Sequence, residues 1–290
     1  MKEHLLSAEK VIAGYDKKII IDGIDICVPS NKISVIIGGN GSGKSTLLKT
    51  LSRLIKPEGG NIVLDGKKIE SYPSKLLAQT LGLLPQSPVV PEGITVFDLV
   101  CRGRFPYRTI MKSMSKSDYD AALEALEVMG IAELANHSVD KLSGGQRQRV
   151  WIALALAQQT DILLLDEPTT FLDIAYQVEI LDLLTELNRT RGITIVMVLH
   201  DINLSARYAD YLFAIRQGRL IVEGTPAKVI SPELIKDIFG LDCCVINDPV
   251  SNSPLLFQSE SITAEYENIR THIAWFSRSK IHCRPPFHHP

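Results

Sequence analysis

One glycine-rich segment constrains the fold of this chain more than any other feature of its sequence. It follows the β-branched run Ile33–Ile37, precedes an apolar helical pattern, and consists of Gly38, Gly39, Asn40, Gly41, Ser42, Gly43, Lys44, Ser45 and Thr46. Glycines let backbone N–H groups turn toward an anion, and the first turn of a helix adds positive potential. The segment therefore matches the phosphate-binding loop pattern and predicts a strand, a phosphate site and a helix in that order.

Two polar side chains of this segment suit a nucleotide phosphate and its metal ion. Lys44 is predicted to reach the β- and γ-phosphates, and the Ser45 hydroxyl to complete the oxygen shell that Mg²⁺ prefers. The alternative is a chance glycine-rich turn, which composition alone would produce in roughly one chain of this size in a hundred. The strand before the loop and the helix after it make that alternative rarer still.

Two acidic residues follow a second apolar run. Ile162–Leu165 precedes Asp166, Glu167 and Pro168, and open α/β sheets bind ligands at the carboxyl ends of their strands. Asp166 suits the outer shell of a Mg²⁺ ion, and Glu167 suits the polarisation of an attacking water molecule. The alternative is a turn with two solvated acids, which the preceding phosphate loop disfavours.

A second potential anion site lies 99 residues after Lys44. Ser143 is a favourable N-cap, and the glycines beside it expose backbone N–H groups at a helix N-terminus in the motif Leu142-Ser143-Gly144-Gly145-Gln146. One chain would hardly direct two such sites at one γ-phosphate. The motif is therefore predicted to face the nucleotide of another subunit, and the alternative is an ordinary capped helix.

Three further side chains are candidates by position. His200 ends the apolar run Ile193–Leu199, and a neutral imidazole can donate to a γ-phosphate oxygen or to the attacking water. Gln86 is a candidate contact of Mg²⁺ or water, and Tyr15, near the start of a strand-like region, is a candidate to stack on adenine. Taken singly, they are equally an ordinary structural His, a loop Gln and a half-buried core aromatic.

The remaining chain alternates short apolar runs with helical patterns, which is typical of an α/β protein. Strands without polar alternation indicate burial on both faces, as in a parallel sheet. The predicted elements are helices over Thr46–Leu54, Asp118–Met129, Gln146–Gln158 and the face Val178, Leu181, Leu184 and Leu187, strands at Asn61–Leu64 and Leu81–Pro85, and a hairpin of Tyr211–Arg216 with Leu220–Glu223.

Composition limits the class of protein. The formal charge of −2 gives no basic footprint, so no nucleic-acid partner is expected. No apolar stretch reaches 18 residues, and the five scattered cysteines suit a reducing cytosol. Residues 249–290 show no strong period, contain four of the seven histidines, and are predicted to form a poorly ordered or weakly docked tail.

Taken together, these motifs resemble the ATP-binding subunit of an ABC transporter. The resemblance runs from Tyr15 to His200 and continues to about residue 256. It implies an α/β fold, a P-loop NTPase (RecA-like) core with an N-terminal antiparallel β portion and an inserted helical subdomain. The implied ATP-binding domain is 1–258, with its helical subdomain at about 86–157, and 259–290 is a tail of uncertain structure.

The same resemblance implies a role for each candidate residue. Tyr15 stacks on the adenine of ATP, Gly38–Thr46 binds the phosphates with Lys44 as the key cation, and Glu167 is the general base. The remaining implied roles are metal contacts for Ser45, Gln86 and Asp166, a switch histidine at His200, a dimer-crossing aspartate at Asp173, and closure on the partner's ATP by Ser143, Gly144, Gly145 and Gln146. Gly39 stands where many relatives have Pro, and no loss of activity is expected from it.

Further stretches are similar to the ATPases of iron–siderophore importers, and haem and cobalamin importers share much of the pattern. They are Leu81–Gln86, Pro91–Val96, Arg102–Arg104, Thr169–Ile174, Val198–Asn203 and Asp248–Val250. The resemblance implies a homodimeric ATPase at the cytoplasmic face of the membrane. Its implied partners are permease subunits, contacted near residues 87–107, and indirectly an extracytoplasmic substrate-binding protein.

Two other classes of protein remain as alternatives. A soluble ABC ATPase that acts on DNA or in translation would show a long coiled coil before Ser143 or two phosphate loops, and the sequence has neither. A nucleotide-binding interaction protein without turnover is disfavoured because Glu167 and His200 are both present.

Overall fold

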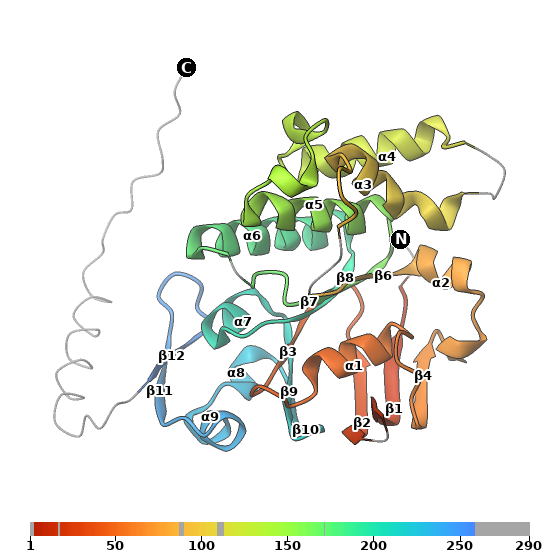
Figure 1. Ribbon diagram of the computed structural model, residues 1–290. Helices are drawn as coiled ribbons and strands as arrows, with labels where there is room; N and C mark the ends of the chain where they lie inside the picture. The colour runs from red at the N-terminus through yellow and green to blue at the C-terminus, as the bar shows by residue number, and fades with distance from the viewer. Residues whose placement is uncertain (1–2, 17, 87–89, 109–112, 171, 259–290) are drawn as a thin grey trace.

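The central strands of the chain form a six-stranded sheet (Figure 1). The computed structural model describes residues 3–16, 18–86, 90–108, 113–170 and 172–258. Five strands are parallel, and only β10 runs antiparallel to its neighbour β9. The order across the sheet is β10 (Arg219–Gly224), β9 (Tyr211–Arg216), β3 (Ile33–Ile37), β8 (Thr194–Val198), β7 (Ile162–Asp166) and β6 (Leu81–Leu84). The predicted parallel sheet and the hairpin of residues 211–223 are confirmed.

Successive side chains of the central strands enter two different hydrophobic clusters. Val35 and Leu163 belong to the cluster on one face of the sheet, whereas Ile36 and Leu164 belong to the cluster on the other. Every residue of β3, β7 and β8 is buried for this reason. The period-two geometry of a strand thus explains why the sequence shows unbroken apolar runs here.

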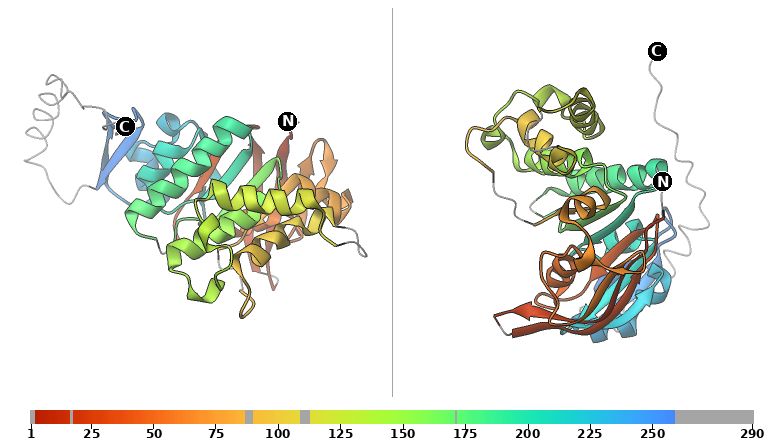
Figure 2. Two further views of the ribbon diagram at one scale, coloured as in Figure 1. Left: turned by 90° about the horizontal axis from the view of Figure 1, so that it is seen from above. Right: turned by 90° about the vertical axis from the view of Figure 1, so that its right-hand side faces the viewer.

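An antiparallel sheet covers the face that carries Ile36 and Leu164, with helix α1 (Lys44–Leu51) in the same hydrophobic cluster. Leu47, Leu48 and Leu51 of α1 are fully buried in a cluster to which both sheets contribute. The right-hand view of Figure 2 shows the first strands of the antiparallel sheet in red. The antiparallel strands are, in order, β2 (Lys18–Val28), β1 (Leu6–Tyr15), β4 (Gly59–Leu64) and β5 (Lys67–Lys68), followed by η1 (Ile69–Ser71) and α2 (Ser74–Thr80). Helix α1 begins two residues before the predicted helix and ends three residues earlier.

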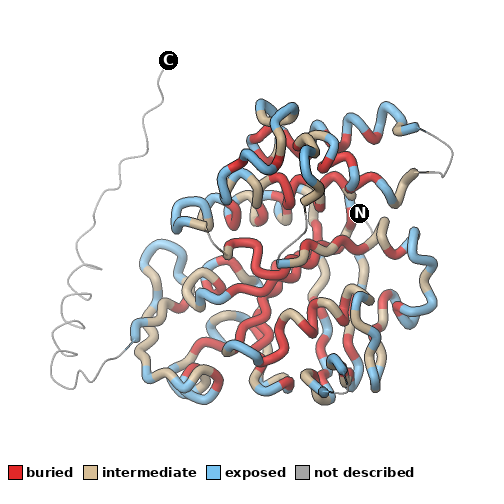
Figure 3. The backbone as a smooth tube through the Cα atoms, in the orientation of Figure 1, coloured by how far each residue is buried: buried red, intermediate tan, exposed pale blue. Residues whose placement is uncertain are grey.

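A helical lobe lies above the six-stranded sheet in Figure 1. Its buried side chains share one cluster with α6 (Ile174–Arg191) and one face of the sheet, and Figure 3 shows this continuous buried region in red. The lobe consists of α3 (Val96–Cys101), η2 (Arg102–Tyr107), α4 (Lys116–Val128), η3 (Ala132–Leu134), η4 (Val139–Lys141) and α5 (Gly144–Ala157). The predicted helices Asp118–Met129 and Gln146–Gln158 are confirmed to within two residues.

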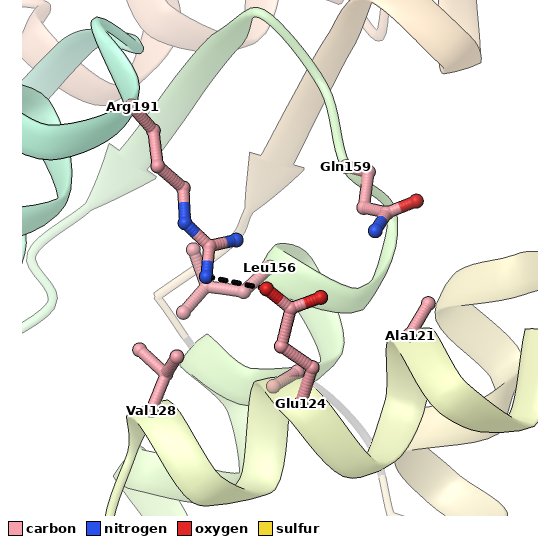
Figure 4. A pocket seen from close by; sticks show the side chains of 7 residues that line it. Ala121, Glu124, Val128, Leu156, Gln159 and Arg191 are labelled. Atoms are coloured by element: carbon pink, nitrogen blue, oxygen red, sulfur yellow. Dashed lines mark hydrogen bonds and ion pairs between the residues drawn. The ribbon is translucent and has the colours of Figure 1, made fainter.

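Charged side chains join the lobe to α6 and hold the elements of the lobe together. Arg191 Nη2 of α6 lies 2.7 Å from Glu124 Oε1 of α4, and both residues line the pocket drawn in Figure 4. Arg104 of η2 is buried, donates to Asp118 at 3.1 Å, and also donates to the carbonyl of Ala157 at 2.7 Å. Because Ala157 ends α5, this guanidinium satisfies a carbonyl that the helix itself leaves unpaired.

The C-terminal part corrects one expectation. Composition placed residues 249–258 in a loose tail, whereas the family resemblance extended the domain to 258; these residues form a turn and a strand. Asp248 holds the turn by accepting from Val250 N–H at 2.9 Å, and the apolar run after it pairs with an earlier strand. The elements are α7 (Ile202–Tyr208), α8 (Pro226–Val229), α9 (Pro232–Phe239), β11 (Cys243–Asn247) and β12 (Pro254–Gln258).

The rest of the predicted tail, residues 259–290, lies outside the described residues. Within the described ranges, no helix combines the length and apolar character needed to cross a membrane.

Candidate functional site

The phosphate loop joins the end of β3 to the start of α1. Gly38, Gly41 and Gly43 have positive φ angles of 154°, 74° and 104°, which glycine adopts without the strain of a side chain. A Cβ atom on Gly38 would lie 2.1 Å from the carbonyl oxygen of Ile215. At Gly39 nothing lies within 4 Å of the corresponding position. The loop therefore requires glycine at some positions and tolerates other residues at Gly39.

Lys44 is held inside this loop. Its Nζ donates to the carbonyl oxygens of Gly38 at 2.9 Å and Gly39 at 3.0 Å, and the residue is only 5% exposed. Burial lowers the pKa of the Lys44 ammonium, and the carboxylates of Glu167 and Asp166 oppose that shift. An ammonium carries three donors, so one remains for a phosphate oxygen.

Ser45 and Asp166 form the part of the site that suits a metal ion. The Ser45 hydroxyl donates to Asp166 Oδ1 at 2.8 Å. Asp166 Oδ2 is buried and, like Ser42 Oγ, has no hydrogen-bond partner among the described residues. Burial raises the pKa of Asp166. A hydroxyl and an unpartnered carboxylate oxygen beside a phosphate loop are ligands that Mg²⁺ prefers, so these residues fit a Mg²⁺–nucleotide complex.

Glu167 is the centre of a cluster of side chains from three neighbouring strand ends. Its Oε1 lies 2.6 Å from His200 Nε2, and its Oε2 accepts a hydrogen bond from Gln86 Nε2. Glu167 is 9% exposed and has a φ of +55°, a left-handed conformation that is strained for a non-glycine residue. The parallel strands β6, β7 and β8 thus bring together three residues that are far apart in the sequence.

Thr170 is a member of this cluster that the sequence analysis missed. Its hydroxyl donates to Glu167 Oε2 at 3.0 Å, and its backbone N–H donates to the Glu167 carbonyl at 3.3 Å. Glu167, Thr170 and His200 line a hollow of about 280 Å³. The sequence did contain a signal for this contact, because a threonine three residues after an acid often forms a hydrogen bond with a nearby group of the same turn.

The first turn of α5 has a different character. Ser143 caps the helix by accepting from Gln146 N–H at 3.3 Å, while Gln146 Oε1 accepts from Ser143 N–H at 3.1 Å. The predicted N-cap is therefore confirmed. Gly144 is exposed, and a Cβ on Gly145 would lie 3.7 Å from the Tyr176 ring. Across the described ranges, no hydrogen bond joins this turn to the phosphate loop.

The start of α6 lies beside this turn. Asp173 is exposed and occupies the N-cap position of α6, three residues before Tyr176. The α5 N-terminus and the start of α6 therefore share one exposed surface. Gly145 and Tyr176 are about 30 residues apart in the sequence, and the approach of the Tyr176 ring to Gly145 is a feature of the folded chain.

Tyr15 is the last residue of β1, shortly before β2 begins at Lys18. It is 47% exposed, which disfavours the alternative of a core aromatic. It pairs with Lys18 at the tip of the β1–β2 hairpin. The next part of β2 reaches the phosphate loop, because a Cβ on Gly43 would lie 2.6 Å from Ile21 Cδ1. The hairpin thus presents an exposed aromatic ring near the loop.

Comparison with known proteins identifies the family. The family model described as ABC transporter matches residues 21–170, over half of the chain, including the phosphate loop and Glu167. The chain belongs to the ABC transporter family.

Two relatives are similar to this chain over most of its length. The ferric enterobactin transport ATP-binding protein FepC of Escherichia coli is 48% identical, over 87% of this chain and 93% of FepC.

A second ABC relative is the iron(3+)-hydroxamate import ATP-binding protein FhuC of Bacillus subtilis, 45% identical over 90% of this chain and 97% of FhuC. Among solved structures, the ATP-binding cassette MJ0796 matches with a TM-score of 0.68 and 31% identity, over 76% of this chain and 98% of that one. That cassette is dimeric, in a post-hydrolysis state bound to ADP and phosphate. The P-loop NTPase fold expected from the sequence is therefore confirmed.

Proposed function

We propose that this chain is the ATP-hydrolysing subunit of an ABC importer for ferric siderophores. The observation that carries the ATPase assignment is the buried Glu167 carboxylate, which lies between Gln86 and His200 in the same site as Lys44. The cargo is supported by the relatives, since FepC and FhuC are named for ferric enterobactin transport and iron(3+)-hydroxamate import.

The phosphate loop and its neighbours bind the nucleotide in this proposal. Backbone N–H groups of Gly38–Thr46 and the free donor of Lys44 receive the phosphates, and Tyr15 stacks on adenine. Ser45 and Asp166 hold Mg²⁺, with Gln86 as a further contact after it leaves Glu167. When bound, Mg²⁺ supplies neutralisation of the phosphate charge that develops during transfer.

Glu167 orients and deprotonates the attacking water. The water oxygen bonds to the γ-phosphorus, the bond from that phosphorus to the bridging oxygen of ADP breaks, and the water proton passes to the carboxylate. Both carboxylate oxygens are occupied in the structure, by His200 on one side and by Gln86 and Thr170 on the other. A carboxylate oxygen can accept two hydrogen bonds, so Oε1, which has His200 as its partner among the described residues, can still accept from the attacking water.

Two copies of the chain complete the site. The first turn of α5 presents the backbone N–H groups of Gly144 and Gly145, which have no partner within the helix. Together with Ser143 and Gln146, this turn faces the partner's ATP across the dimer. Asp173, on the same surface, crosses to the partner. The dimeric MJ0796 cassette supports this arrangement. The domain is 1–258, and its helical part, about 86–157, contacts the permease near residues 90–107; residues 87–89 of the expected contact lie outside the described residues.

Two measurements test the proposal. The purified chain is expected to release phosphate from ATP only with Mg²⁺, and a chain without such turnover overturns the ATPase assignment. Vesicles that contain the cognate permease, with the extracytoplasmic binding protein outside and the chain at the cytoplasmic face, are expected to accumulate labelled ferric siderophore. Accumulation of haem or cobalamin in its place overturns the cargo and leaves the ATPase assignment intact.

A further inference from the structure

The C-terminal hairpin is tied to the candidate catalytic cluster through one side chain, that of Asn203. Asn203 Oδ1 accepts from the backbone N–H of Leu256 at 2.7 Å, and Asn203 Nδ2 donates to the Leu256 carbonyl at 3.1 Å. Both polar groups of the amide are thus paired with both polar groups of one residue of β12. The two residues are 53 positions apart in the sequence.

Asn203 lies in the first turn of α7, three residues after His200. Asp201 caps this turn by accepting from Leu204 N–H at 2.8 Å, and its carbonyl accepts from the Ser205 hydroxyl at 2.6 Å. The turn is therefore a stiff unit that begins immediately after His200. A displacement of Asn203 relative to the hairpin moves the backbone of His200 with it.

The hairpin is itself fixed to the core, so it can serve as a support. Val245 and Leu256 are cross-strand partners that pack against the main hydrophobic cluster. The opposite end of α7 is held separately, because the Tyr208 hydroxyl donates to Asp182 of α6 at 2.8 Å. Asn203 is thus the polar link at the end of α7 that carries His200.

His200 depends on its backbone for its position. Its side chain is 47% exposed, whereas that of Glu167 is 8% exposed. An imidazole with so little packing around it is placed by the chain that precedes α7 rather than by neighbouring side chains. The 2.6 Å separation between His200 Nε2 and Glu167 Oε1 therefore reflects how α7 is seated.

We propose that Asn203 is a positioning residue for ATP hydrolysis: by joining α7 to the hairpin of residues 243–258, it sets the place of His200 relative to Glu167. The inference rests on the proposed ATPase function. Under this proposal the hairpin contributes to the reaction by positioning α7, in addition to packing against it.

The test compares the full chain with the variant Asn203→Leu, which keeps the approximate side-chain volume and removes both hydrogen bonds. We expect kcat to fall about fivefold, the effect of roughly one net hydrogen bond, with KM for ATP unchanged. Asn188→Leu is the matched control, because Asn188 Nδ2 donates to the Ile193 carbonyl at 2.7 Å at the far end of α6. That variant is expected to lower the melting temperature and leave kcat unchanged.

A double-mutant cycle separates positioning from simple destabilisation. If Asn203 acts through His200, Asn203→Leu lowers kcat in the presence of His200 and causes no further loss in a His200→Ala background. An equal loss in both backgrounds, or an unchanged kcat in Asn203→Leu, overturns the inference. Asn203→Ala is measured in the same cycle in case the leucine variant does not fold. Wild-type chain without ATP turnover would instead refute the proposed function itself.

Discussion

The two parts of the molecule that face nucleotide in this proposal are built in opposite ways. Around Lys44 and Glu167, the polar groups are buried and interlocked, and the donors and acceptors come from four strand ends. The first turn of α5 is exposed, and its hydrogen bonds run only between Ser143 and Gln146. The first part is complete within one chain, whereas the second has its unpaired N–H groups at the surface and needs something to bring an anion to it.

This difference has a physical origin. The buried part forms where parallel strands end side by side, so side chains from distant segments meet. The α5 turn needs only local sequence, because a capped helix N-terminus offers N–H groups wherever it stands. Substitutions in the first part should therefore affect nucleotide binding by the single chain, whereas substitutions in the second should affect ATP turnover only through the assembled dimer.

The largest expected effect is that of Glu167→Gln in the buried part. Turnover should fall by about 10²- to 10⁴-fold, the usual contribution of a general base, while ATP still binds and the dimer forms. Phosphate release and size-exclusion chromatography with ATP measure the two properties. Turnover near that of the wild type would remove Glu167 from its assigned role.

The variant Gly144→Ala tests the exposed part. A Cβ there has nothing within 4 Å, and replacing glycine by alanine at an unstrained position stabilises a protein by about 0.4–1 kcal/mol, because the unfolded chain loses conformational entropy. The nucleotide-free chain should therefore unfold at a higher temperature. Turnover should fall about 10²-fold, since a shift of roughly 1 Å in a phosphate contact has that effect. A variant that is more stable and fully active would show that no nucleotide approaches this turn.

Lys44→Met sharpens the comparison from the side of binding. We expect the dissociation constant for ATP to rise by about 10- to 100-fold, the value of a hydrogen bond from a charged donor. Because burial lowers the pKa of Lys44, the folded state disfavours this charge, and the melting temperature without nucleotide should not fall. Calorimetric titration and thermal unfolding give both numbers; a large loss of stability would show instead that Lys44 holds the loop together.

The smallest expected effect is that of Asp166→Asn on the melting temperature and on its dependence on pH. Burial raises the pKa of Asp166 above its ordinary value of 3.8, so the folded chain retains this proton to higher pH than the unfolded chain. The stability that comes from the protonated form is present below 3.8 and is lost as pH rises through the raised pKa. At pH 7.5 the nucleotide-free variant should melt about 2 °C above the wild type, and the gap should narrow as the pH falls through the raised pKa of Asp166. A gap independent of pH would contradict this sign.

Much of the fold followed from local pattern. The phosphate loop between β3 and α1, the N-cap at Ser143 and the strand before Asp166 depend on residues that are neighbours in the sequence. The parallel sheet followed from unbroken apolar runs, because strands buried on both faces cannot alternate with polar residues. The helix ends were less certain, since capping by Gly43 and Ser143 adds a partial turn that periodicity does not show.

Contacts between segments that are distant in the sequence were harder to predict from the sequence. Arg104 lies within residues 87–107, the range expected to contact the permease, yet its side chain is buried against Asp118 and the end of α5. The strand Pro254–Gln258 was assigned to a loose tail, because a five-residue strand has too few residues to show a period. Its pairing with Cys243–Asn247 and its link to Asn203 exist only in the folded chain.

The sequence by itself determined the phosphate loop, the acids after β7 and the capped turn of α5, because glycine conformation, helix capping and strand burial act over a few neighbouring residues. Only the tertiary structure decided that Gln86, Thr170 and His200 all contact Glu167, that Tyr15 stands on an exposed hairpin tip, and that the hairpin of residues 243–258 supports α7. The strand order of a parallel sheet controls these contacts, and that order depends on how whole elements pack across the core.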